Sequence, residues 1–98
     1  MINIEKYNID EETITRLGLR LSEKHANLDP SSRVFEYPHL DGVYIMESDL
    51  YGNKMPKDSC FLAFNSHHGM IGKHLYVETL KNASVDDIQE IVKANEEG

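Results

Sequence analysis

Residues 59–65 read Ser-Cys-Phe-Leu-Ala-Phe-Asn, and this is the most hydrophobic segment of the chain. Its apolar residues, 60–64, follow one another without the alternation of a half-buried strand. A short continuous apolar run of this kind is typical of a strand that is covered on both faces. We therefore expect a central strand of a sheet here, with the other elements packed around it.

Two further elements are predicted on the C-terminal side of this strand. After a polar tip at 65–69, residues 70–80 alternate between apolar and polar side chains, which indicates a half-buried strand. Ser84 is then a candidate N-cap of a last helix. Its predicted buried stripe consists of Val85, Ile88, Ile91 and Val92.

On the N-terminal side, the pattern indicates a β-hairpin and a loop. Residues 33–37 and 43–47 are rich in β-branched and aromatic side chains, and the turn between them closes on Asp-Gly. Residues 48–58 contain a Gly-Asn pair and a proline without any period, so they are predicted to form a long loop. Its apolar side chains either fold back over the core or face a partner: Leu50, Tyr51 and Met55.

An N-terminal helix is predicted over residues 11–28. Apolar residues recur there at helical spacings, and Asp10 is placed to cap the first turn. Asp29-Pro30 is expected to end the helix, because the residue before a proline is pushed out of the α region. The stripe consists of Ile14, Leu17, Leu21 and Leu28, with His25 packed at its edge.

These elements define an α+β fold in a single domain, because 98 residues are too few for two independent cores. We expect a two-layer sandwich in which an N-terminal helix and a C-terminal helix cover a four-stranded, mainly antiparallel meander sheet. Ile2 and Ile4 hint at an additional short edge strand.

The charge balance bears on the partner. The chain has 17 acidic and 10 basic residues, and residues 82–98 carry much of the excess. Such a field repels phosphates, so direct nucleic-acid binding is not expected, and a basic protein surface is favoured as the partner. The acidic side chains expected to face this partner are Asp86, Asp87, Glu90, Glu96 and Glu97.

The resulting hypothesis is a small, acidic, non-enzymatic protein-binding module. In a stronger version it is an inhibitor or immunity-type protein that masks a nucleic-acid-binding surface, because carboxylates on a rigid helix can imitate backbone charge. Leu50, Tyr51 and Met55 are further candidate contacts. A homodimer through the sheet edge or through this loop is a third hypothesis.

The alternative function is a metal-binding regulator or a small metal-dependent enzyme that uses His67, His68 and His74. Neutral imidazoles ligate zinc and other first-row metals, but a site needs three or four converging ligands, and Glu47 or Asp49 would have to complete it. No nucleophile elbow and no phosphate-binding loop occur. No catalytic residue and no cofactor are therefore predicted.

The sequence also bears on compartment. It has no apolar stretch of the about 20 residues that a membrane-spanning helix requires, and the first residues lack the features of a signal peptide. The lone Cys60 has apolar neighbours, which indicates a buried, unreactive thiol. These features predict a cytoplasmic protein.

Overall fold

The computed structural model describes residues 7–22, 32–66 and 69–96. Within these ranges the chain forms three helices and five strands, in the order α1 (Glu11–Leu17), β1 (Arg20–Leu21), β2 (Val34–Glu36), β3 (Tyr44–Met46), β4 (Ser59–Ser66), β5 (Gly69–Tyr76), α2 (Val77–Asn82) and α3 (Val85–Glu96). The α+β class predicted from the sequence is confirmed. The described helices are too short or too polar to cross a bilayer.

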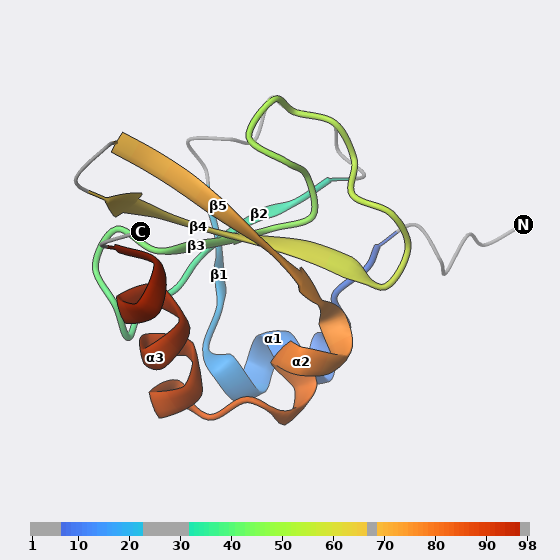
Figure 1. Ribbon diagram of the computed structural model, residues 1–98. Helices are drawn as coiled ribbons and strands as arrows, with labels where there is room; N and C mark the ends of the chain where they lie inside the picture. The colour runs from blue at the N-terminus through green and yellow to red at the C-terminus, as the bar shows by residue number, and fades with distance from the viewer. Residues whose placement is uncertain (1–6, 23–31, 67–68, 97–98) are drawn as a thin grey trace, which may run out of the picture.

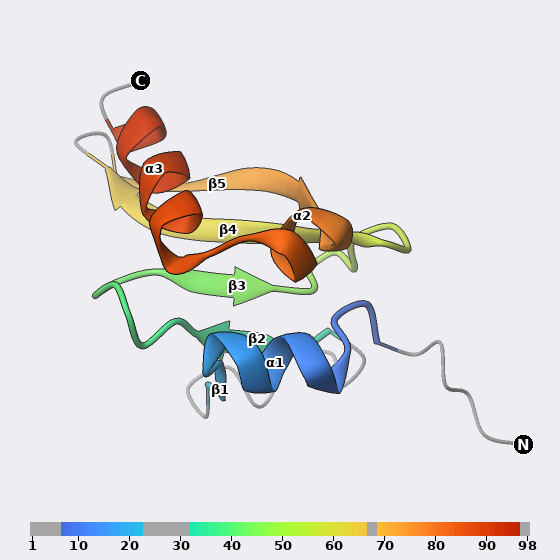
Figure 2. The same ribbon diagram turned by 90° about the horizontal axis from the view of Figure 1, so that it is seen from below.

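The five strands form one antiparallel sheet in the order β1-β2-β3-β4-β5, so each strand lies beside its neighbour in sequence. All three helices lie on one face of this sheet, and the loop between β3 and β4 projects from the opposite side (Figure 1). Figure 2 shows α1 along the half of the sheet that contains β1 and β2, and α2 and α3 along the half that contains β4 and β5.

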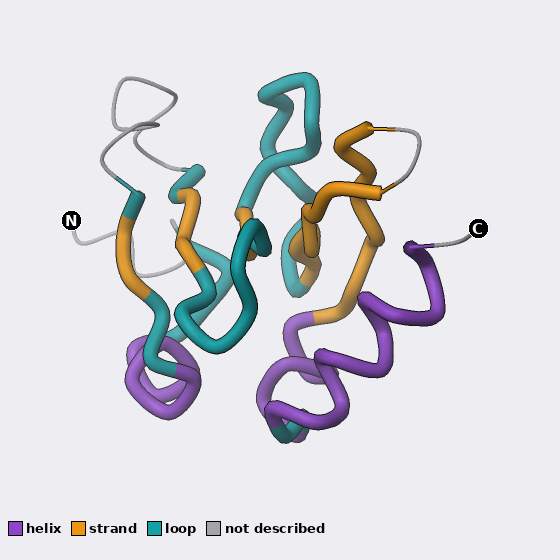
Figure 3. Tube along the Cα trace, turned by 90° about the vertical axis from the view of Figure 1, so that its left-hand side faces the viewer, coloured by secondary structure: helices purple, strands orange, loops and turns teal. Residues whose placement is uncertain are grey.

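Figure 3 shows the strands and the helices as two layers, and the side chains of the core cluster come from both layers. One row across the sheet, Phe35, Ile45 and Leu62, is in register from β2 to β4 and almost fully buried. Leu17, Leu80 and Ile88 supply the buried helix side chains that complete the same cluster. Because β4 lies between β3 and β5, the apolar run that predicted a central strand is explained.

The N-terminal helix is much shorter than predicted. Asp10 caps it as expected, accepting a hydrogen bond from the Thr13 amide at 2.9 Å, but α1 ends at Leu17. Gly18 then adopts a left-handed conformation with φ 69°, and its amide donates to Ile14 and Thr15. Glycine is the residue best suited to this C-terminal cap, so it stops the helix long before Pro30.

The segment after Gly18 forms β1, a strand that the sequence did not predict. Residues Arg20–Leu21 pair with β2, and Leu21 is 57% exposed, so it does not belong to a buried helical stripe. The prediction of four strands was therefore one too few. The predicted edge strand at Ile2 and Ile4, and the part of the predicted helix that holds His25 and Leu28, lie outside the described residues.

The predicted strand over 70–80 is divided between two elements. β5 ends at Tyr76, and α2 begins at Val77. Val77 and Leu80 are both buried, with the spacing of three that belongs to a helix. The alternation of Leu75, Val77 and Thr79 satisfied a strand period by chance, so it hid this turn of helix.

The remaining elements agree closely with the sequence. The hairpin forms from β2 and β3, and the Tyr37 amide donates to the Val43 carbonyl across its turn. Ser84 caps α3 by accepting from the Asp87 amide at 3.1 Å. Ile88 and Val92 are buried as predicted, whereas Val85 is 38% exposed.

A buried carboxylate connects the N-terminal segment to the sheet. Glu47, directly after β3, is 0% exposed. Its Oε2 accepts hydrogen bonds from the Asn8 amide at 2.7 Å and the Ile9 amide at 2.9 Å. Its Oε1 accepts from the Arg33 amide at 3.0 Å and from Arg33 Nε at 2.9 Å.

Arg33 is held by the groups around this carboxylate. Its Nη2 donates to the Ile9 carbonyl at 2.8 Å, and its guanidinium lies 3.8 Å from the centroid of the Tyr7 ring. Burial alone would raise the pKa of Glu47, but the hydrogen bonds from Arg33 and Ile9 outweigh it and hold the pKa below its usual value. Glu47 is therefore ionised, paired and fully hydrogen-bonded inside the protein.

Replacing Glu47 with glutamine should destabilise the fold by about 3 kcal/mol, because Arg33 would lose its buried counter-ion. Urea unfolding at neutral pH measures this difference. Glu12→Gln, at an exposed position of α1, is the matched control and should change the free energy of unfolding little. Equal stabilities of the two variants would contradict the role assigned to Glu47.

The depressed pKa of Glu47 also predicts the sign of the pH dependence. The contribution of this carboxylate to stability is complete above its unfolded pKa, near 4.5, and is lost as the pH falls through the lower folded pKa. The stability difference between wild type and Glu47→Gln should thus shrink in acid. Urea unfolding across this pH range checks the trend, and a difference that grows on acidification would refute it.

Candidate protein-binding surface

The loop between β3 and β4, residues 48–58, is held in shape by its own hydrogen bonds. Asp49 Oδ1 accepts from the Tyr51 amide at 2.8 Å and from the Asn53 amide at 2.9 Å. The Asp49 amide donates to the Asn53 carbonyl at 2.8 Å, and a β-bridge joins Ser48 to Lys54. This is the Asx-type turn that aspartate favours, and it closes the loop into a defined hairpin.

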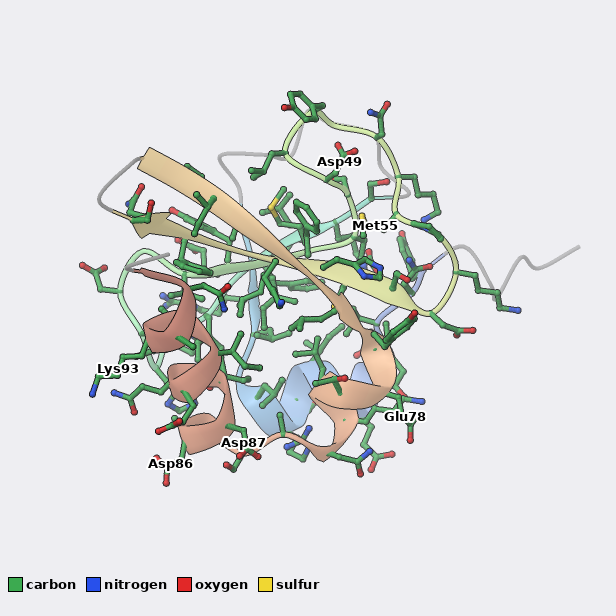
Figure 4. The ribbon with its side chains drawn as sticks, viewed as in Figure 1. Asp49, Met55, Glu78, Asp86, Asp87 and Lys93 are labelled. Atoms are coloured by element: carbon green, nitrogen blue, oxygen red, sulfur yellow. The ribbon has the colours of Figure 1, made fainter. Side chains whose placement is uncertain are left out.

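The three apolar side chains of this loop have different fates. Met55 folds back and is 8% exposed, and its amide donates to the Glu47 carbonyl at 3.0 Å. Leu50 is 42% exposed, and Tyr51 is 90% exposed. Figure 4 shows Asp49 between the two arms of the loop and Met55 at its base, and the loop stands away from the helices. Folding back over the core, one of the two interpretations left open by the sequence, is therefore observed for Met55, whereas the Tyr51 side chain lies in solvent.

A groove of 520 Å³ lies between this loop and the open face of the sheet. The sheet contributes side chains from four strands, and the loop contributes Leu50 and Tyr51 at the rim. The residues that line the groove are Val34, Tyr44, Met46, Ser48, Asp49, Leu50, Tyr51, Gly52, Ala63 and Met70. We call the surface formed by these residues the loop groove.

The loop groove is mainly apolar and aromatic. Among the residues that the structure describes, its lining contains no basic side chain and a single carboxylate, that of Asp49. The pKa of Asp49 lies below its usual value because backbone amides, first that of Asn53, donate to its oxygens. Since these oxygens are occupied by the loop itself, the groove offers apolar area and aromatic rings rather than acid-base groups.

Sequence reasoning missed the sheet side of this groove. Tyr44 and Met46 lie on the face of β3 opposite the buried Ile45, and Val34 is their neighbour on β2. The signal was present, because residues 43–46 are apolar at every position, which indicates that both faces of the strand are covered or in contact.

Three of the acidic residues predicted as partner contacts lie in the described part of the chain, where all three are exposed and one also caps its own helix. Asp86, Asp87 and Glu90 lie on α3, and Figure 4 shows the first two at its N-terminal end. Asp87 Oδ2 accepts from the Ser84 amide at 2.9 Å, and this bond is the first cause of its lowered pKa. Glu97 and the side chain of Glu96 lie outside the described residues.

Basic groups are interspersed among these carboxylates. Lys93 lies on the same helix as Glu90, and Lys81 of α2 is 3.6 Å from Asp10. Arg16 of α1 donates to the carbonyls of Leu80 and Ala83, which ties α1 to the end of α2. Several helix charges thus have a capping or bridging role that requires no partner.

The predicted histidine site is only partly within the described residues. His67 and His68 lie outside them. His74 lies in β5 in register with Phe61, and its ring packs edge-on against Tyr76 at 5.3 Å. Among the residues that the structure describes, no three His, Cys, Asp or Glu side chains are grouped to hold a metal ion.

The two carboxylates considered as further metal ligands have other partners. Glu47 is fully buried against Arg33, and Asp49 accepts hydrogen bonds from amides of its own loop. Coordination by either would require these bonds to break. The three-histidine hypothesis therefore gains no additional ligand from Glu47 or Asp49 as they stand.

Cys60 is a core residue, as predicted. It is 0% exposed and free. Burial, and secondarily the charge of Glu47, raises the pKa of its thiol to about 12. A thiol in this environment remains protonated at neutral pH and does not act as a nucleophile.

Comparisons with protein-family models, with curated proteins and with solved structures give no match to this chain.

The burial of Cys60 predicts its reactivity. A thiol-specific reagent should leave native protein unmodified and label Cys60 at a rate limited by unfolding. Tyr51→Cys, which introduces a thiol at a 90% exposed position, should react at once under the same conditions. Rapid labelling of the wild-type protein without denaturant would show that the core around Cys60 is open.

Proposed function

We propose that this chain is a non-enzymatic protein-binding module whose contact surface is the loop groove. The observation that carries the proposal is the exposed aromatic ring of Tyr51, 90% accessible on a loop that its own hydrogen bonds hold in place. A large aromatic side chain displayed in this way, beside an apolar groove, has the composition of an interface hot spot.

The rigidity of the loop strengthens this interpretation. Ordering a loop on binding consumes part of the interaction free energy, so a loop that is already ordered binds more tightly for the same contacts. Asp49 secures the two ends of the tip, and the Met55 side chain and amide anchor the return segment to the core. Tyrosine adds contact area at a small entropic cost, because it has only two side-chain torsions.

The lining of the loop groove also indicates what it would bind. It consists mainly of aliphatic, methionine and tyrosine side chains, and the described residues place no cation in it. Methionine adapts to the shape of an apolar partner. We infer a partner protein that inserts an uncharged, apolar segment, and the affinity should depend only weakly on salt.

Site-specific photo-crosslinking tests this proposal. Benzoylphenylalanine in place of Tyr51 should give a discrete adduct with another protein in an extract of cells that contain the chain naturally. The same group in place of Leu21, which is 57% exposed on β1, is the control and should give none. Adducts of equal yield at both positions, or adducts with a second copy alone, would contradict the proposal.

The role of loop order has its own test. Asp49→Ala removes the acceptor of the Tyr51 and Asn53 amides but leaves the apolar lining in place. We expect binding of the crosslinked partner to weaken by about tenfold, with little change in the free energy of unfolding. Isothermal titration and urea unfolding measure the two effects. Unchanged affinity would show that Asp49 does not preorganise the surface.

A second candidate follows from the helix layer. Acidic residues outnumber basic ones in α1 and α3, and Asp86 and Glu90 are exposed there. An inhibitor or immunity-type protein that masks a basic, nucleic-acid-binding surface would use these groups. Its affinity would fall steeply with salt, and Asp86→Asn with Glu90→Gln would weaken it, whereas Tyr51→Ala would not.

For the compartment, we propose the cytoplasm. The only cysteine is free and buried, so no disulfide supports the fold in an oxidising compartment. Fractionation of the native cells with an antibody against the chain tests this placement, and recovery outside the cytoplasmic fraction would overturn it.

A further inference from the structure

β5 is an unusually long strand for the edge of this sheet. It has eight residues, and it forms the end of the strand order beside β4. The register with β4 is unbroken over all eight pairs, from Ser59 and Tyr76 to Ser66 and Gly69, so no bulge distorts it. The strand also contains no proline. A bulge and a proline are two devices that protect an edge strand, whose outer amides and carbonyls can pair with another strand; the one charge that opposes pairing in β5 is that of Lys73.

The opposite edge differs sharply. β1 has two residues, Arg20 and Leu21, and its first residue is a cation. A strand of this length offers few ladder hydrogen bonds, and such short, charged edges resist pairing. We therefore expect a further strand to pair with β5 rather than with β1.

The sequence of β5 indicates which strand would pair with it. Residues 70–76 read Met-Ile-Gly-Lys-His-Leu-Tyr, and large apolar or aromatic side chains stand at equal distances from Lys73: Ile71 and Leu75, then Met70 and Tyr76. In an antiparallel pair related by a two-fold axis at Lys73, each residue faces the one at equal distance on the other side of the centre. We propose that two copies of this chain pair through β5 in this register and form one continuous sheet.

On the open face, the proposed register brings exposed apolar side chains together. Met70 is 45% exposed and Tyr76 is 63% exposed, and each would lie opposite the other in the second copy. Sulfur–aromatic contacts of this kind are favourable. Two of the large hydrophobic side chains that the single chain leaves in solvent would thereby gain a partner.

The next pair in the register is Gly72 with His74 of the second copy. The Phe61 ring lies over Gly72, where an added Cβ would be 2.4 Å from the ring. The imidazole of the second copy would therefore meet the edge of an aromatic ring rather than an empty glycine surface. Aromatic cross-strand pairs of this type stabilise sheets.

On the helix face, Ile71 would lie opposite Leu75, and Lys73 would lie opposite its own copy. The apolar pair extends the core cluster, in which Leu75 is 7% exposed and Ile71 is partly buried. The lysine pair opposes association by charge repulsion, as does the net charge of −7 on each chain. Rising salt should consequently favour the dimer, the opposite of the dependence expected for an acidic surface that binds a basic partner.

A pair of eight-residue strands buries less area than the about 1,200 Å² of a standard interface, so a weak, reversible dimer is expected. Light scattering after size exclusion should show a mass that rises from 11.2 kDa toward twice this value as the concentration approaches about 1 mM. Lys73→Thr should tighten the dimer by about twofold to fivefold, because it removes the opposed charges.

Disulfide trapping tests the register itself. The Cα atoms of directly opposed residues lie within disulfide range, so Lys73→Cys should cross-link to its own copy under mild oxidation. Leu21→Cys, on the opposite edge, is the matched exposed control and should cross-link at least about fivefold more slowly. Cys60 is buried in both variants and does not contribute.

A mass of 11.2 kDa at every concentration would overturn the proposal, as would equal rates of cross-linking at positions 73 and 21. The dimer does not rest on the proposed function of the loop groove. Tyr51→Ala should leave the dimer unchanged, and Tyr76→Lys, at an exposed position outside the lining of the loop groove, should abolish it while the fold remains intact. The two proposals therefore fail separately.

Discussion

The carboxylate of Glu47 must be satisfied inside the protein, and the arrangement of the surrounding segments follows from this requirement. An ionised group that is fully removed from water is stable only with a counter-ion and a complete set of hydrogen bonds. Arg33 supplies the charge, and the amides of Asn8, Ile9 and Arg33 supply further donors. The N-terminal segment is thus fixed against the β2–β3 hairpin before α1 begins. Asn8 then contacts the chain on either side of the entry to β4, through the Pro56 and Ser59 carbonyls.

Glu47 also connects the buried Arg33–Glu47 pair to the candidate binding surface. The Glu47 backbone carbonyl accepts from the Met55 amide, where the loop returns to the core. Asp49, two residues after Glu47, then closes the tip that displays Tyr51. The loop is consequently supported at its base by the core and at its tip by its own hydrogen bonds. An exposed aromatic ring on such a support is suited to recognition, since little order has to be gained on binding.

Local patterns in the sequence were sufficient to predict the hairpin, the central strand and the last helix. Each of these elements has a period or a cap that only one structure satisfies. Local patterns were insufficient where two of them competed. At Gly18 the cap ended a helix whose apolar spacing continued to Leu28, and at Val77 a strand-like alternation concealed a helical turn. The Glu47 network could not be predicted, because it joins residues that lie 14 and 39 positions apart.

The candidate site was likewise predicted only in part from the sequence. An apolar loop with Tyr51 was visible in the sequence, but the groove beside it combines side chains from four strands and depends on their register. The acidic residues of α3 were counted correctly, yet composition does not reveal that Asp87 is engaged in capping its own helix.

The most direct measurement for this account is amide hydrogen exchange of Asn8 and Ile9 in the native protein. Both amides lie outside the helices and strands, where exchange is ordinarily fast, but both donate to the buried Glu47 carboxylate. We expect protection comparable to that of the amides in β3 and β4. Exchange at the rate of an unstructured peptide would contradict it, because the N-terminal segment would then not be held by Glu47.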